Sequence, residues 1–143
     1  MEINKELLDG LLAEAKEKPR LRQNFDLRTS SADTSQRMIN ALQPQTEVPI
    51  HRHENTAETV ICLVGKLEEI IYEEVNEYVH EATSCCDDVI RQKSFKEVSR
   101  QILSPAEGKF GIQIPAGAWH TINVIEPSVI FEVKDGAYRG DDR

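Results

Sequence analysis

Cysteine and long apolar runs are scarce in this 143-residue chain. The three cysteines, Cys62, Cys85 and Cys86, are an odd number without CxxC spacing, so neither a disulfide framework nor a zinc ribbon is supported. The longest apolar run, Val60 to Val64, is far too short to span a bilayer. The N-terminus also lacks the basic segment and apolar stretch of a secretory signal. These features predict a cytoplasmic protein with reduced thiols and no membrane partner.

Basic residues are also fewer than acidic ones. Seventeen basic residues stand against twenty-five acidic ones, a net charge of −8. Residues 54–88 hold ten acidic residues and one basic residue, Lys66, and the rest of the chain holds fifteen acidic and sixteen basic ones. An acidic field of this kind repels phosphate backbones, and no basic stripe offsets it. We therefore expect no nucleic-acid partner.

The apolar pattern changes after Pro19 from helical spacing to short alternating segments. Residues 4–17 predict an amphipathic helix, with Asn4 as its cap and Pro19 beyond its end. Strand-like segments then follow at 37–42, 48–53, 59–64, 67–72, 110–114, 120–125 and 129–134. Residues 75–108 are compatible with an extra hairpin or a short helix. The pattern predicts an all-β sandwich or barrel with one N-terminal helix.

Three of the four histidines form an ordered constellation. His51 and His53 are two residues apart in a predicted strand, which places both rings on one face. Glu58 opens the next segment, and a turn at Pro115 to Gly117 directly precedes His120. Imidazole and carboxylate together suit a divalent transition metal, namely Fe, Mn, Ni, Co or Zn, and four ligands leave coordination positions open. The sequence predicts a metal site at these four residues.

The pattern HxHx4Ex6G followed by PxGxxH resembles the two motifs of the cupin superfamily. The resemblance implies a double-stranded β-helix, or jelly-roll, barrel in which His51, His53, Glu58 and His120 bind the metal. Gln45 stands where the first motif has a glycine, and Asn123 lies one residue early for the second. The implied domain organisation is a helix at 1–19 packed on the barrel, a single cupin barrel at 20–138 and a flexible tail at 139–143.

A narrower resemblance covers most of the chain. Arg22 to Phe25, Gln36 to Pro44, the HRH segment and Phe131 to Tyr138 look like WbuC-type cupin-fold metalloproteins. Members of that family often occur beside genes for bacterial surface-polysaccharide synthesis, and their reaction is not established. The resemblance implies a sugar or nucleotide-sugar derivative as the small-molecule ligand. Cupin domains also commonly form homodimers.

Several side chains have two open interpretations. Cys62 shares a face with Glu58 and is either a small buried hydrophobe or a reactive or metal-binding thiol. Trp119 either stacks on a ligand or packs at the barrel rim. Arg37 and Asn40 are an odd number of residues apart, so at most one of them faces the pocket of a regular strand.

Further polar residues are also open to two interpretations. Glu132 either pairs with Lys134 or contacts the substrate, and Glu54 competes with Glu58 for the metal. Arg52 must point away from the two histidines beside it, where it is expected to pair with a carboxylate. His80 is expected on the surface.

Three functions fit these observations. The first is a metal-dependent enzyme, such as an isomerase, lyase or oxygenase, acting on a small oxygen-rich molecule. The second is a binding module that uses a metal to hold a sugar or carboxylate without turnover. The third is a dimeric interaction protein with a structural metal. The sequence identifies metal ligands but no dedicated catalytic base, and fold alone does not decide between these functions.

Overall fold

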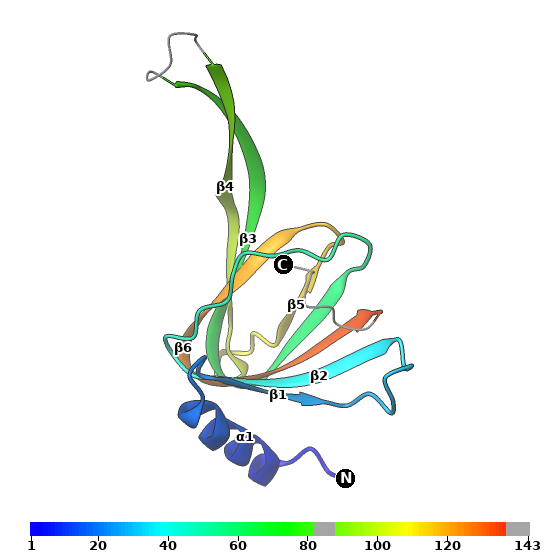
Figure 1. Cartoon of the computed structure of the whole chain (residues 1–143). Coiled ribbons are helices and arrows are strands. Elements are labelled where there is room, and N and C mark those ends of the chain that lie inside the picture. The colour runs from blue at the N-terminus through cyan, green and yellow to red at the C-terminus, as the bar shows by residue number, and fades with distance from the viewer. Residues whose placement is uncertain (82–87, 137–143) are drawn as a thin grey trace.

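The computed structural model describes residues 1–81 and 88–136, with side chains for residues 1–78 and 92–136. One helix, α1 (Lys5–Glu17), precedes a sheet whose strands are β1 (Arg22–Asp26), β2 (Ser35–Leu42), β3 (Glu58–Glu81), β4 (Asp88–Leu103), β5 (Gly111–Ile114) and β6 (Trp119–Asp135). A short 3-10 turn, η1 (Pro105–Glu107), follows β4. The sheet order is β1-β2-β6-β3-β4, and β5 pairs with β3. The sheet curls into a barrel, which confirms the predicted all-β architecture (Figure 1).

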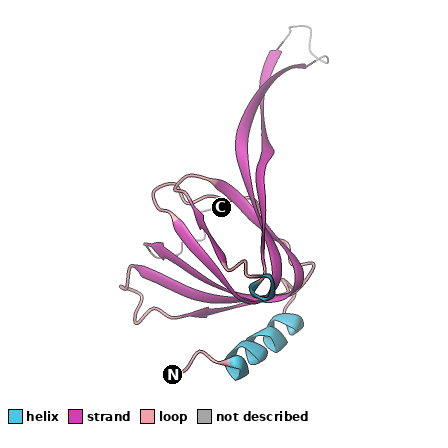
Figure 2. Cartoon of the chain, turned by 180° about the vertical axis from the view of Figure 1, so that it is seen from behind, coloured by secondary structure: helices cyan, strands magenta, loops and turns pink. Residues whose placement is uncertain are grey.

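The N-terminal helix begins and ends as the sequence predicts. The Asn4 side chain accepts a hydrogen bond from the Leu7 backbone N–H, and the helix ends at Glu17, with Lys18 as its C-cap before Pro19. Leu11 and Ala15 are buried against Ile39, Ala41 and Val129 on the outer face of the sheet. Figure 2 shows the helix beneath the strands, outside the barrel. The helix therefore serves the protein's own packing.

Alternate residues of β2 face opposite sides of the sheet and belong to two different apolar clusters. Its odd residues, Ile39 and Ala41, face the helix, whereas Leu42 belongs to a second apolar cluster within the barrel. That inner cluster comprises Leu42, Val60, Cys62, Leu67, Leu103, Ile114, Val124 and Ile130. The barrel is thus filled by aliphatic side chains at one end. Cys62 is 2% exposed within this cluster, so its apolar interpretation is confirmed.

Two predicted pairs of strands are single strands in the structure. Segments 59–64 and 67–72 both lie in β3, and 120–125 and 129–134 both lie in β6. The register between β3 and β6 is irregular from Cys62 to Leu67. Gly65, which in the sequence indicates a turn, therefore lies inside β3. Gly65 has a φ of 97°, and a Cβ there would meet Pro127 O and Ser128 Oγ. The glycine marks a bulge rather than the end of a strand.

One other prediction is wrong, one strand was not predicted and one open alternative is decided. Residues 48–53 are not a strand, because only His51 forms an isolated bridge, with His120. Residues 22–26, which the pattern did not indicate, form β1. Of the two options for 75–108, the hairpin is the correct one, since β3 and β4 pair from Leu67–Leu103 to Glu81–Asp88. The end of this hairpin stands clear of the barrel as a two-stranded ribbon (Figure 1).

Some predictions fall on residues that are not described. Cys85, Cys86 and the tail at 139–143 lie outside the described residues, and so does the side chain of His80. Within the described part of the chain, α1 with its 13 residues is the longest helix, and no helix has the length and apolar character needed to cross a lipid bilayer.

Candidate metal centre

Three predicted ligands, His51, His53 and His120, come together at the wall of the barrel. Each offers a ring nitrogen, and these nitrogens lie within 4.8 Å of one another. His51 and His120 are held by an antiparallel bridge, and their ring centroids are 4.2 Å apart. His53 follows in the same irregular segment, with its centroid 5.4 Å from that of His51. The His53 carbonyl also accepts from the Gly117 N–H at 2.7 Å, so the convergence depends on tertiary backbone contacts and not on strand alternation.

Backbone carbonyls fix the tautomers of two of these histidines. The Nδ1–H of His51 donates to the Pro49 carbonyl at 2.8 Å, and that of His120 donates to the Ala118 carbonyl at 2.9 Å. Because a carbonyl can only accept, the proton resides on Nδ1, and Nε2 keeps its lone pair in the neutral ring. His120 Nε2 is buried and has no hydrogen-bond partner among the residues that the structure describes. Such carbonyl contacts are typical of metal-binding histidines.

The surroundings favour the neutral form of these rings. Burial, followed by the charge of His120, lowers the pKa of His51 to about 4. Burial also lowers the pKa of His120. A neutral imidazole has the lone pair that a metal ion requires. These two rings are therefore ready to bind a cation at neutral pH.

Glu58 lies beside the histidine group but is not one of the three residues whose ligand atoms lie within 4.8 Å. Its Oε2 is 2.8 Å from Nε2 of His53. Burial alone would raise the pKa of Glu58, but the hydrogen bond from His53 and the charges of the histidines lower it overall. An ionised carboxylate at this place is available to a cation or holds His53 in position. The structure thus brings all four predicted residues into one neighbourhood.

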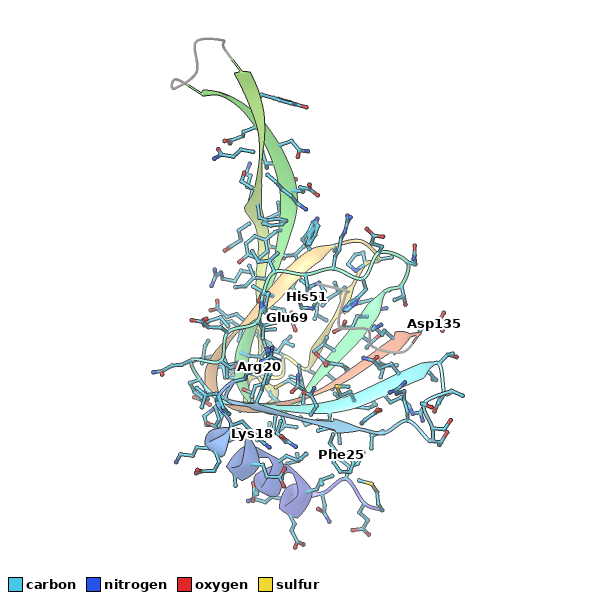
Figure 3. All side chains as sticks on the ribbon, in the orientation of Figure 1. Lys18, Arg20, Phe25, His51, Glu69 and Asp135 are labelled. Carbon is cyan, nitrogen blue, oxygen red and sulfur yellow. The ribbon has the colours of Figure 1, made fainter. Side chains whose placement is uncertain are left out.

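These four residues line a cavity of about 390 Å³ within the barrel. Its other walls come from β1, β2, β3, β6 and the segment before β1, and they include Arg20, Gln36, Asn40, Glu69 and Glu132. Figure 3 labels three of the lining residues, His51, Glu69 and Arg20, on the ribbon. Sites for small molecules commonly have this size and a few convergent polar groups.

These positions decide between the interpretations of Arg37 and Asn40 and place Glu132 and Arg52. Asn40 lines the cavity, whereas Arg37 is outside its lining and pairs with Asp33 at 3.0 Å. Glu132 lines the cavity, so it is positioned to contact a ligand. Arg52 pairs with Glu54 at 2.6 Å, as expected for a residue facing away from its neighbours.

Trp119 lies at the junction between the histidine segment and the projecting ribbon. Arg52 Cζ and Lys93 Nζ each lie 4.6 Å from the centroid of its ring. Phe95 of β4 also packs against it, with a centroid separation of 4.9 Å. Cation–π and aromatic contacts therefore hold the indole. Trp119 packs at the rim and is not among the residues lining the cavity.

Sequence reasoning missed Glu69, which is 2% exposed and faces the cavity. The bulge at Gly65 is the reason. Before it, the even residues Glu58, Val60 and Cys62 point inward, and after it the odd residues Leu67 and Glu69 do. A period-two count begun at Glu58 therefore places Glu69 on the wrong face. The isolated glycine was the available signal for this change.

Comparison with known proteins agrees with this fold. The profile of a family described as "Domain of unknown function (DUF6016)" matches residues 3–83, more than half of the chain. The chain belongs to this family. No curated protein matches the sequence.

Solved structures show the architecture more clearly. KdgF from Halomonas sp. is 14% identical, with a TM-score of 0.54 over 85% of each chain. Oxalate oxidase in complex with glycolate is 11% identical, with a TM-score of 0.56 over 87% of this chain and 56% of its own. The SPY1581 protein of unknown function from Streptococcus pyogenes is 15% identical, with a TM-score of 0.50 over 85% of this chain and 80% of its own. This chain has the cupin fold.

Proposed function

We propose that this member of the DUF6016 family is a metal-dependent protein that binds and transforms a small oxygen-rich molecule within its barrel. The observation that carries the proposal is the group of three imidazoles at the cavity wall. Two of them have carbonyl-anchored Nδ1 atoms and lone pairs on Nε2. His51, His53 and His120 would hold a divalent metal, with Glu58 as a fourth ligand. Nitrogen and oxygen donors of this kind suit Fe, Mn, Ni, Co or Zn.

A metal at this position would act as a Lewis acid on a carbonyl or hydroxyl oxygen of the ligand. The chain's own residues would orient the ligand and exclude water. The aliphatic cluster closes one end of the barrel interior, and Glu69 and Glu132 place carboxyl groups in the cavity wall. These carboxyl groups are the candidates for holding or moving a proton. An isomerase, lyase or oxygenase would need these elements.

The ligand we propose is a sugar or nucleotide-sugar derivative linked to surface-polysaccharide metabolism. Support comes from the resemblance of Arg22 to Phe25, Gln36 to Pro44 and Phe131 to Tyr138 to WbuC-type cupin-fold metalloproteins. The first two of these segments contribute β1 and β2 to the cavity. One of the structural neighbours, oxalate oxidase, was solved with glycolate, a small molecule with adjacent oxygens. A non-catalytic binding module is the alternative that the experiments below separate.

Elemental analysis of protein purified without added metal tests the metal site. We expect one divalent transition metal per chain and its loss in His53→Ala, since removal of an imidazole leaves too few donors. His80→Ala, which removes a histidine outside the motif, is the matched control and should keep the metal. Unchanged stoichiometry in His53→Ala would show that the site is assigned wrongly.

Substitution of Glu58 separates its two roles. Glu58→Gln keeps the size of the side chain but removes its charge, so a ligand role predicts at least a 10-fold loss of metal affinity. A role limited to positioning His53 predicts a smaller loss, because an amide oxygen still accepts the hydrogen bond.

The visible spectrum of the Co(II)-substituted protein tests ligand binding. An oxygen-rich ligand that reaches the metal should change the spectrum in the wild type and not in His120→Ala. A changed spectrum followed by product formation supports an enzyme, and a changed spectrum without product supports a binding module. A spectrum that no hydroxy acid perturbs would favour a structural metal.

A further inference from the structure

One part of the barrel interior is polar where a small barrel is normally filled with aliphatic side chains. Gln36, Met38 and Asn40 occupy alternate positions of β2 and all line the cavity. Glu69 of β3 and Glu132 of β6 complete this wall. On the same face of β2, the next alternate residue, Leu42, already belongs to the aliphatic cluster. The change from apolar to polar residues thus coincides with the cavity.

Three polar atoms of this wall have no hydrogen-bond partner among the described residues. They are Gln36 Oε1, Asn40 Oδ1 and Glu69 Oε2, which are buried, and His120 Nε2 is a fourth buried atom in the same state. All four belong to residues that line the same cavity. An unpaired buried polar atom costs stability, and native proteins contain few of them. Four such atoms in residues that line one cavity indicate that the cavity is shaped for a polar ligand.

The chemistry of these atoms defines what that ligand must offer. The amide oxygens of Gln36 and Asn40 only accept hydrogen bonds, so the ligand must donate. Burial, followed by the charges of Glu58 and Glu132, raises the pKa of Glu69 well above its ordinary value. Burial, followed by the charge of Glu58, likewise raises the pKa of Glu132 to about 8. An uncharged carboxyl group both donates to and accepts from a hydroxyl group, as an amide does.

We propose that Gln36, Asn40 and Glu69 form a hydroxyl-binding wall that selects a polyhydroxylated acid over a simple chelating acid. The inference rests on the proposed function, because the part of the ligand that does not contact this wall is expected to bind the metal held by the histidines. Hydroxyl groups satisfy the three oxygen atoms, whereas an apolar chain leaves them unpaired. Arg20 and Arg22, which line the same cavity, supply positive charge for a carboxylate. The wall therefore determines specificity and is distinct from the metal ligands.

Calorimetric titration of metal-loaded protein with two probes tests this inference. D-gluconate and glycolate are both hydroxy acids, and they differ in the additional hydroxyl groups of gluconate. We expect gluconate to bind at least 10-fold more tightly, which is the effect of one or two net hydrogen bonds. Equal affinities would overturn the inference while leaving the proposed function in place. Binding of neither probe would overturn both.

Substitutions in the hydroxyl-binding wall test which residues produce the preference for gluconate. Asn40→Ala should reduce the preference for gluconate about 5-fold and leave glycolate affinity unchanged. Asn123→Ala is the matched control, since that amide lies outside the cavity lining and already donates to Glu68 at 2.8 Å. Glu69→Leu should remove most of the preference, and Glu69→Gln should retain it because an amide reproduces an uncharged carboxyl group. Loss of the preference in Asn123→Ala would contradict the assignment.

Thermal stability without ligand provides an independent measurement. If Glu69 is kept for a ligand, the apolar variant Glu69→Leu should melt at the same temperature as the wild type or higher, because an unpaired buried group has been removed. A fall of several degrees would show that Glu69 supports the fold and would contradict its role in binding. Gln36→Leu gives a second variant for the same comparison.

Discussion

His51 and His120 are joined by two backbone hydrogen bonds, although 69 positions of sequence separate them. The N–H of His51 donates to the His120 carbonyl at 3.0 Å, and the N–H of His120 donates to the His51 carbonyl at 2.8 Å. This pair is an isolated bridge between an irregular segment and the start of β6. It fixes the separation of the two imidazoles before any metal binds, so the site is organised by the backbone.

Acidification is expected to release the metal. Protons compete with the metal for Nε2 of His51 and His120, whose pKa values are lowered by burial, that of His51 from 6.5 to about 4. Metal content after long equilibration should therefore stay high in mild acid and fall as the pH decreases through about 4. In the metal-free protein the unfolded chain takes up these protons first, so the free energy of unfolding should decrease as the pH falls from 6.5 to 4. Metal content that stays constant well below pH 4 would argue against histidine ligation.

Glu132 is expected to give the metal-free protein the opposite pH dependence at higher pH. Its pKa is raised from 4.5 to about 8, first by burial and then by the charge of Glu58. The folded state therefore keeps a proton that the unfolded state releases, and this contribution to stability is complete below pH 4.5 and lost as the pH rises through 8. Urea unfolding at several pH values should show a flatter profile for Glu132→Gln than for the wild type. Parallel profiles would contradict this prediction.

Substitution of Gly65 should destabilise the barrel. Its φ of 97° disfavours any side chain, and a Cβ would collide with Pro127 O and Ser128 Oγ. We expect Gly65→Ala to lower the free energy of unfolding by about 1 to 3 kcal/mol. Gly10→Ala is the control, because Gly10 lies within α1 with no atom within 4 Å of its Cβ position. That change should instead stabilise the protein by up to about 1 kcal/mol. Similar effects of the two changes in urea unfolding would contradict the assigned bulge.

The projecting ribbon is expected to mediate a homodimer. Pairing of β3 with β6 ends at Tyr72, and from there to Glu81 the described partner of β3 is β4 alone. A two-stranded ribbon with both edges open is only marginally stable in isolation. Sedimentation equilibrium should therefore give about twice the chain mass of 16.2 kDa.

Substitutions at two exposed aromatic residues test whether the dimer interface lies on the ribbon. Tyr78 on the ribbon is 71% exposed, and Tyr78→Lys should weaken the dimer. Phe110→Lys, at an exposed position on the barrel, should leave it intact. A wild-type mass that stays near 16 kDa at all concentrations would exclude the dimer.

The candidate metal-site residues and much of the fold class follow from local patterns in the sequence. His51, His53 and His120 were identified by order and spacing, because each spacing matches a recurring motif. Helix α1 was predicted within one residue, since its cap and its apolar spacing are local properties. The position of Gln45 is also informative. It has a φ of 75°, so the left-handed conformation expected of the motif glycine persists although the glycine does not.

Contacts between distant segments decide which other residues line the cavity. The bulge at Gly65 reverses the inward face of β3, and that reversal brings Glu69 into the cavity. The segment at 48–53 has the pattern of a strand, yet only His51 forms a β-bridge, and the His53 carbonyl accepts from the Gly117 N–H at 2.7 Å, because contacts with β6 and the turn before it set the place of this segment. Alternation along a strand is a local property, whereas bulges and bridges depend on segments far away in the chain. The histidines could thus be found from the sequence, and the acidic and amide wall facing the same cavity could not.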